Sequence, residues 1–220
     1  MLDLARLDES APGLLDLSVL DAQERQRVQG FVHAKDRLRY AVAHTALRRI
    51  LGACVGAPAR DIVLVRETCP CCGGPHGRPA LADAPFPLHF SLSHGGDRVL
   101  IGLATVAVGV DVEPEATPET SGELIPALHP AEQAELAAVP QERRGAAFTR
   151  LWARKEAYLK GIGTGLGRDL AADYLGTGGL AGSPPGWSVT DLPAGPKHFA
   201  ACAALGAAHR TRVRHLSTPL

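Results

Sequence analysis

The sequence predicts an α+β fold: a pseudo-two-fold pair of similar subdomains, each with a small, mainly antiparallel sheet packed against helices. In each half of the 220-residue chain, segments with helical periodicity are followed by short strand-like runs, and this order starts again near residue 105. With 45% hydrophobic residues, the chain is long enough to bury a sizeable core. We therefore divide it into residues 1–105 and 106–220, although no sequence repeat relates them.

The first half begins with a predicted helix over residues 21–52. Asp21 can cap its start and Glu24, three residues on, can complete a capping box. Gly30 indicates two helices rather than one, and Gly52 is the predicted end.

Strand-like segments follow. Residues 62–65 predict a short strand, and the Pro/Gly-rich stretch 69–87 predicts a loop. Residues 88–93 alternate apolar and polar side chains, as in a strand with one buried face, and the apolar runs 98–104 and 106–113 suit neighbouring antiparallel strands.

The second half predicts helices over about 121–138 and 143–161, the latter closed by Gly161. Two short runs near the end, "GWSVTDL" and "HFAACAAL", predict strands.

Composition argues against several classes of protein. The chain has 23 Lys and Arg residues and 23 Asp and Glu residues, so it has no net positive charge that would attract nucleic acid. No apolar stretch is long enough for a membrane span, and acids in the first ten residues argue against a signal peptide. Five cysteines, an odd number, are expected to be thiols of a cytoplasmic protein.

The charges are nonetheless segregated. Residues 21–50 carry a local net charge of +4, and residues 111–142 carry −8. Two solvated helical faces would explain this pattern. A basic site for an anion beside an acidic site for a cation would explain it too.

Asp111 and Glu113 are the first candidate ligands. They follow an apolar run, and residues i and i+2 of a strand share a face, so both carboxylates point the same way. Mg²⁺ is held by such oxygen ligands together with substrate phosphates. A strand end emerging into solvent before Pro114 is the alternative.

The helix "FTRLWARKEAYLKG" adds further candidates. Trp152, Glu156 and Lys160 are spaced i, i+4, i+8, with Lys155 on the neighbouring row. Glu156 and Lys160 would pair on any exposed helix. Alternatively, Glu156 completes a carboxylate trio with Asp111 and Glu113, while the lysines face a phosphate.

Several motifs together resemble the 4′-phosphopantetheinyl transferases, in particular the long, single-chain surfactin-synthetase-activator type. "VGVDVE" is followed about forty residues later by "FTRLWARKEAYLKG", and upstream lie "GRPAL" and "FSLSHGGDRVLIGLA". Ser91 and Gly95 depart from the family's usual residues at those positions. The resemblance covers about residues 20 to 205 and implies a pseudo-dimer of two α+β halves.

The resemblance also implies roles for individual residues. Asp111, Glu113 and Glu156 would hold Mg²⁺, or Mn²⁺ in its place, against the pyrophosphate of coenzyme A. Asp111, Glu156 and Lys160 would form the catalytic group. The coenzyme A-binding residues would be Arg27, Arg39, Arg78, Ser93, His94, Lys155 and Lys160. Glu132 matches an acidic residue of the family, and the resemblance implies no particular role for it.

The implied reaction transfers 4′-phosphopantetheine from coenzyme A to a serine of an apo acyl or peptidyl carrier protein and releases 3′,5′-adenosine bisphosphate. We expect a monomer that binds neither nucleic acid nor membrane. Glu156 is a candidate for the base, although a carboxylate on a metal is a weak one. A non-catalytic coenzyme A or carrier-binding module and an Mg²⁺-dependent nucleotide hydrolase remain alternatives.

Two other motifs stay open. "CPCCGGPHG" offers Cys69, Cys72 and His76 at a partial zinc spacing, whereas a closed structural site needs four ligands. "GIGTGLGRDL" is Gly-rich but follows a helix and lacks the Lys-[ST] of a P-loop, so we read it as a loop. Adjacent strand positions make a Ser93–His94 catalytic dyad a poor candidate.

Overall fold

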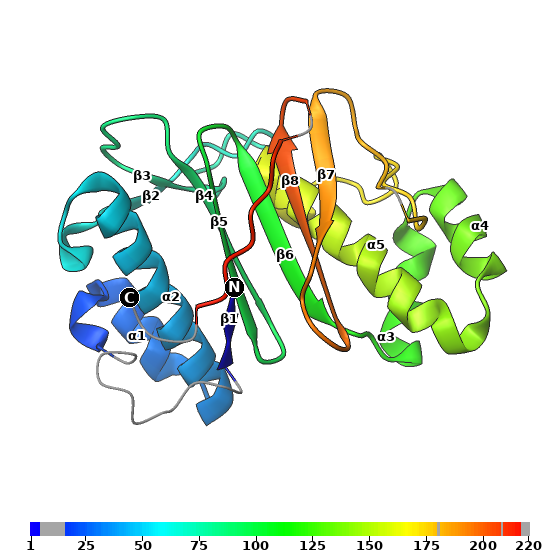
Figure 1. Cartoon of the computed structure of the whole chain (residues 1–220), viewed down its shortest axis with the longest axis horizontal. Helices are drawn as coiled ribbons and strands as arrows, with labels where there is room; N and C mark the ends of the chain where they lie inside the picture. The colour runs from blue at the N-terminus through cyan, green and yellow to red at the C-terminus, as the bar shows by residue number, and fades with distance from the viewer. Residues whose placement is uncertain (5–15, 180, 208, 217–220) are drawn as a thin grey trace.

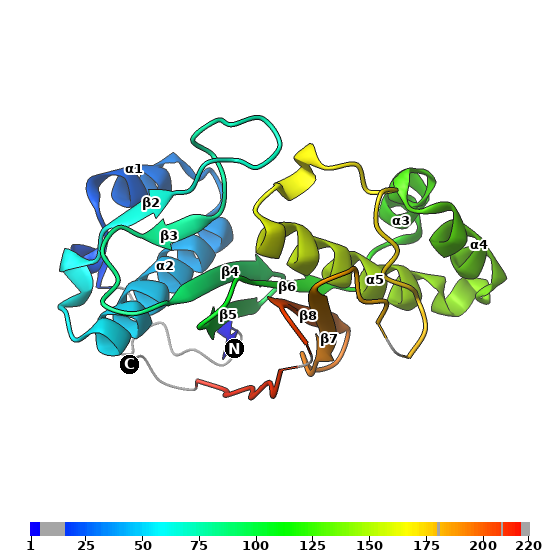
Figure 2. The same ribbon diagram turned by 90° about the horizontal axis from the view of Figure 1, so that it is seen from above.

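The computed structural model describes residues 1–4, 16–179, 181–207 and 209–216. Two three-stranded antiparallel sheets lie at the centre, with helices on either side of them (Figure 1, Figure 2). The first sheet has the order β1 (Leu2–Asp3), β5 (Arg98–Ala104), β4 (His89–Gly95), and the second the order β6 (Val108–Pro114), β8 (His198–Leu205), β7 (Trp187–Leu192). A separate hairpin joins β2 (Leu64–Arg66) to β3 (Pro79–Leu81). This architecture confirms the predicted fold class.

Helix α2 (Ala34–Val55) packs against the first sheet, and α1 (Ala22–Gly30) packs against α2. The predicted capping box at Asp21 and Glu24 is present, with the Glu24 N–H donating to Asp21 at 2.8 Å. The predicted end at Gly52 was wrong: α2 runs on to Gly56, which takes the left-handed φ of 73°. Gly52 instead lets the chain fold back closely, since a Cβ there would lie 2.5 Å from the Ala57 carbonyl oxygen.

The second half contains α3 (Pro118–Leu124), α4 (Pro130–Ala138) and the long α5 (Gln141–Ile162), which packs across the second sheet. Helix α5 ends at Ile162 and is capped by Gly163, with φ 82°, and does not close at Gly161 as predicted. Gly161 is a packing position, because a Cβ there would lie 2.6 Å from the Trp187 ring. Both strands predicted near the end are present as β7 and β8.

The predicted pairing of the two apolar runs was also wrong. In the described chain β5 pairs with β1 and β4, whereas β6 pairs with β8 and opens the second sheet. Strand β6 meets β4 through side chains: Ser91 Oγ accepts a hydrogen bond from the Val110 N–H at 3.0 Å, and Ser93 Oγ one from the Val112 N–H at 3.3 Å. This junction buries both serines on the face predicted to meet solvent.

Each half thus has one three-stranded sheet and one 22-residue helix, α2 or α5. A division into subdomains at residue 105 stays a prediction. None of the described helices combines the length and apolar character needed to cross a membrane.

Gly109 brings β6 and α5 into backbone contact. A Cβ at this position would lie 1.9 Å from the Ala157 carbonyl oxygen and 2.3 Å from the Gly161 nitrogen. Backbone atoms of a strand and a helix cannot yield as a flexible side chain can, so α5 would have to move away from β6.

We predict that Gly109→Ala lowers the free energy of unfolding by about 3 kcal/mol or more, because overpacking against backbone forces two elements apart. Urea denaturation followed by circular dichroism measures this. Gly122→Ala is the matched control, since a Cβ at this exposed position of α3 meets nothing within 4 Å. Equal unfolding midpoints for the two variants would contradict the close approach.

Candidate functional site

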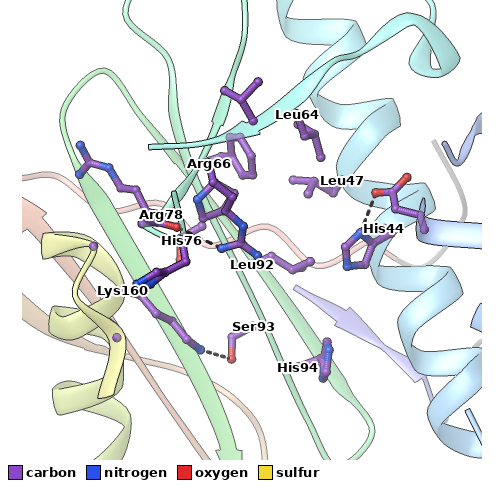
Figure 3. Close-up of a pocket in the computed structure, with 18 of the residues that line it drawn as sticks. His44, Leu47, Leu64, Arg66, His76, Arg78, Leu92, Ser93, His94 and Lys160 are labelled. Atoms are coloured by element: carbon purple, nitrogen blue, oxygen red, sulfur yellow. Dashed lines mark hydrogen bonds and ion pairs between the residues drawn. The ribbon is translucent and has the colours of Figure 1, made fainter. Parts of the chain in front are cut away.

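A cleft of about 1140 Å³ opens between the two halves. Its walls come from α1, α2, the β2–β3 hairpin, β4, and the end of α5 with the loop after it (Figure 3). The polar and charged side chains on these walls are those of Asp21, Gln23, Glu24, Arg27, Tyr40, His44, Arg66, His76, Arg78, Ser91, Ser93, His94, Glu113, Lys160 and Thr164.

Asp111 lies beneath the cleft floor with no exposed surface. Its Oδ1 accepts hydrogen bonds from Ser93 Oγ at 2.7 Å and from Lys160 Nζ at 2.6 Å. Its Oδ2 is buried and accepts a hydrogen bond from none of the described residues. A buried carboxylate oxygen without a donor is costly, and a cation would compensate it. This oxygen therefore fits one ligand position of the predicted magnesium site.

Glu113 and Glu156 add further carboxylates nearby. Burial, then the neighbouring charge of Asp111, raises the pKa of Glu113 to about 7, with Glu156 adding to the effect and Lys160 opposing it. Burial also raises the pKa of Glu156, with Lys160 lowering it and Asp111 raising it. The three carboxylates therefore interact electrostatically with one another, and the Lys160 ammonium is the positive charge that opposes their repulsion.

The ligand atoms of the three carboxylates do not cluster closely in this structure. Among the described residues, three potential ligand atoms gather within 4.8 Å of one another at Cys69, Cys72 and His76 and not at the acidic trio. The Lys160 ammonium instead sits directly on Asp111 Oδ1. Asp111, Glu113 and Glu156 thus provide negative charge and the buried Asp111 Oδ2 as a candidate ligand atom, while the Lys160 ammonium contacts Asp111 Oδ1.

Basic side chains line the opposite parts of the cleft. Arg27 lies over the Phe31 ring, 5.1 Å from its centroid. Arg78 donates to the Glu67 carboxylate and to the Gly161 carbonyl, both at 2.8 Å, so it ties the β2–β3 hairpin to the end of α5. Arginine binds phosphates well because its planar group donates two hydrogen bonds at once. The cleft therefore has the chemistry of an anion site.

Two acids on the cleft wall share one buried arginine as their partner. The buried Arg48 donates to Glu24 Oε2 at 2.5 Å and to Asp21 Oδ2 at 2.6 Å. His44 approaches the other Glu24 oxygen at 2.8 Å and stacks on Tyr40, with ring centroids 3.9 Å apart. These contacts reduce the repulsion that Asp21 and Glu24 would exert on an anionic ligand.

His94 and Arg39 occupy the α2 side of the site. His94 lines the cleft, and burial lowers its pKa, with Arg39, His44 and Lys160 lowering it further and a backbone hydrogen bond opposing them. A neutral imidazole can still donate one hydrogen bond to a ligand. Arg39 is outside the cleft lining and pairs with Asp36 at 2.9 Å.

Lys155 lies elsewhere, which corrects the prediction that it faces a phosphate. It is 2% exposed, and its ammonium contacts the carbonyls of Leu170 and Asp173, at 2.8 and 2.7 Å, and Glu132 Oε2 at 2.8 Å. Glu132 is fully buried and also accepts from the Leu175 N–H at 2.7 Å. The pair fastens α4 and α5 to the loop after α5.

Sequence reasoning missed some cleft residues. Arg66 and His44 line the cleft but belong to none of the motifs. The basic character of residues 21–50 was the one signal near His44, and none pointed to Arg66. The Gly-rich stretch 161–170 is predicted to be a loop, but its first two residues belong to α5. Residues 163–167, which include a short 3₁₀ turn, follow the helix and line the cleft.

Comparisons with known proteins agree on one family. A family model described as the 4′-phosphopantetheinyl transferase superfamily matches residues 107–183, and one described as 4′-phosphopantetheinyl transferase, N-terminal, matches residues 12–106. The chain belongs to the 4′-phosphopantetheinyl transferase superfamily, a family of enzymes, which confirms the resemblance.

Curated relatives carry the same name. The chain is 29% identical over 211 residues to the 4′-phosphopantetheinyl transferase HetI of Nostoc sp., covering 91% of this chain and 85% of the relative. It is 28% identical over 150 residues to psf-1 of Bacillus pumilus, covering 68% and 60%. The crystal structure of Thermotoga maritima holo-[acyl-carrier-protein] synthase matches with a TM-score of 0.36 and 27% identity over 46% of this chain and 63% of that one, and no conclusion rests on it.

We predict that Lys155→Met costs about 3–5 kcal/mol of folding stability, because it leaves Glu132 charged, buried and unpaired. The double variant Lys155→Met/Glu132→Leu should recover much of that loss, since it removes both charges. Thermal unfolding of the two variants measures the difference. A stable Lys155→Met protein that binds coenzyme A much more weakly would contradict this structural role and restore the predicted ligand role.

Proposed function

We propose that this enzyme transfers 4′-phosphopantetheine from coenzyme A to a serine of an apo carrier protein. The observation that carries this proposal is the buried Oδ2 of Asp111, which has no hydrogen-bond donor among the described residues and lies beneath a cleft lined with basic side chains. A buried acid with a free oxygen suits a divalent cation, and the arginines and Lys160 suit the phosphates of coenzyme A. The family membership supports the same reaction.

The cation proposed for this site is Mg²⁺, or Mn²⁺ in its place, held by Asp111, Glu113 and Glu156. When bound, it neutralises charge that develops on the phosphates during transfer. Ser93 and Lys160 hold Asp111 Oδ1, so the other oxygen stays directed away from them. Lys160 also lines the cleft, where its ammonium can contact a phosphate oxygen.

Coenzyme A binding is assigned to the wider cleft. Arg27 and Arg78 would contact phosphates, and His94 with Ser93 would lie at the phosphoadenosine end. Arg39 acts on His94 electrostatically and is proposed to reach the nucleotide only by leaving Asp36. Lys155 is not part of this set, because its ammonium is enclosed by two backbone carbonyls and Glu132.

The reaction is a displacement at the β-phosphorus of coenzyme A. The carrier serine oxygen forms the new P–O bond, the bond to the bridging pyrophosphate oxygen breaks, and 3′,5′-adenosine bisphosphate leaves. The serine proton passes to a base, for which Glu156 is the candidate, directly or through water. Burial raises the pKa of this half-buried carboxyl, whereas coordination of a cation would make it a weaker base, so the proton would be taken by a Glu156 oxygen that does not bind the cation or by a water beside it. Most of the catalysis is positioning and electrostatic stabilisation.

The carrier is proposed to dock at the mouth of the cleft between the halves 1–105 and 106–220, with one chain sufficient for the reaction. A non-catalytic coenzyme A-binding module and a nucleotide hydrolase are the competing functions, and each gives a different result in the same assay.

We predict that coenzyme A, Mg²⁺ and an apo carrier domain give a carrier heavier by one phosphopantetheine, measured by intact-mass spectrometry. EDTA and Asp111→Ala should each reduce the rate by at least roughly 100-fold, because the transferring phosphates lose their counter-charge. Glu115→Ala, at an exposed position two residues beyond Glu113, is the control and should keep the wild-type rate.

Bound coenzyme A with no mass gain on several carrier types would favour the binding module. Adenosine bisphosphate released without a carrier would show a hydrolase. Either result would overturn the proposed transfer.

A further inference from the structure

A second cluster of potential metal ligands lies in the loop between β2 and β3. The Sγ atoms of Cys69 and Cys72 and a ring nitrogen of His76 all lie within 4.8 Å of one another. Cys72 Sγ is 2.9 Å from His76 Nε2. Two thiols and an imidazole are the ligand types that zinc prefers, and the cluster is separate from the acidic trio.

The backbone around the cluster forms a tight turn. The Cys69 N–H donates to the Gly74 carbonyl at 2.7 Å, and the Gly73 N–H donates back to the Cys69 carbonyl at 2.9 Å. Gly73 has a φ of 72°, in the left-handed region that favours glycine. These two hydrogen bonds fold Cys69 and Cys72 onto the same side of the turn.

Gly74 leaves room for the ligands themselves. A Cβ at this position would lie 2.9 Å from the His76 ring and 3.4 Å from Cys72 Sγ. A side chain here would therefore displace the imidazole from the thiol. The absence of a side chain keeps the two donor atoms in contact.

The base of the loop is fixed by the hairpin. The Glu67 N–H donates to the Arg78 carbonyl at 3.0 Å, and the Gly77 N–H donates to the Glu67 carbonyl at 2.9 Å. Cys69 is only 2% exposed, although it is part of none of the hydrophobic clusters that form the described core. Its burial therefore comes from the turn around it and not from packing against the sheets.

We propose that Cys69, Cys72 and His76 bind a zinc ion, with the neighbouring Cys71 or a water molecule as the fourth ligand. Tetrahedral zinc with bonds of about 2.0–2.3 Å holds its ligand atoms roughly 3.3–3.8 Å apart, so the observed cluster needs only small adjustments. The site is outside the acidic trio and does not depend on the proposed transfer reaction.

Zinc would have a structural consequence for the cleft. The same loop carries His76 and Arg78, both of which line the cleft, and Arg78 bonds to the end of α5. The loop has no regular secondary structure between Arg66 and Pro79. A metal cross-link at its tip would order it and so keep Arg78 in position.

The test is the zinc content of the full-length protein after reduction, incubation with ZnCl₂ and removal of unbound metal. We expect about one zinc ion per chain, measured by inductively coupled plasma mass spectrometry. Cys72→Ser should weaken zinc binding by more than roughly 100-fold, since it removes a direct ligand and even outer-shell changes cost 10–100-fold. Cys54→Ser is the matched control, an exposed thiol on α2 far along the chain from this loop, and should keep the wild-type content.

Cobalt substitution keeps the test independent of variant folding. Co²⁺ added to the wild-type protein should give thiolate charge-transfer bands and the visible spectrum of a tetrahedral ion. Wild-type protein without stoichiometric zinc and without these bands would overturn the proposal. So would zinc content unchanged in Cys72→Ser, or a Cys69–Cys72 disulfide that persists in the reduced, zinc-treated protein.

Discussion

The structure depends most on how one buried carboxylate is held. Asp111 on β6 accepts hydrogen bonds from Ser93 on β4 and Lys160 on α5, so three elements from both halves meet at one side chain. Removing a carboxylate from water is costly unless its charge is met by donors or cations. Within the described part of the chain, its Oδ2 accepts no hydrogen bond, so the contact that joins the halves leaves one oxygen available to a cation.

The close approach of β6 and α5 makes this contact possible. Gly109 lets the helix backbone reach the strand, and Lys160 can then extend along the strand to Asp111. Helix α5 carries a second lysine, Lys155, five residues earlier. At 3.6 residues per turn the two lysines point about 140° apart around the helix axis. Lys155 therefore points away from Asp111 and pairs with Glu132.

Much of this arrangement could be predicted from sequence. The capping box at Asp21 and Glu24 is a local pattern, and the i, i+2 spacing of Asp111 and Glu113 is a property of any strand. The motifs around these residues also indicated the family, which the comparisons confirmed.

What the sequence did not show was long-range contact. The burial of Ser91 and Ser93 comes from β6 lying against β4, which no pattern within β4 reveals. The predicted ends of α2 and α5 were wrong because Gly52 and Gly161 resemble helix stops. Both are helical positions at which another segment of the chain approaches the helix closely. Lys155 was misassigned because a buried ion pair with a residue 23 positions earlier leaves no local trace.

The proposed function requires Asp111 to bind a divalent cation beneath the cleft. Titration of the protein with Mn²⁺ in the presence of coenzyme A, with free Mn²⁺ followed by electron paramagnetic resonance, tests it most directly. We expect one bound Mn²⁺ per chain, and an affinity at least roughly 100-fold weaker in a folded Asp111→Asn variant that still binds coenzyme A. Equal Mn²⁺ affinity in the two proteins would contradict it.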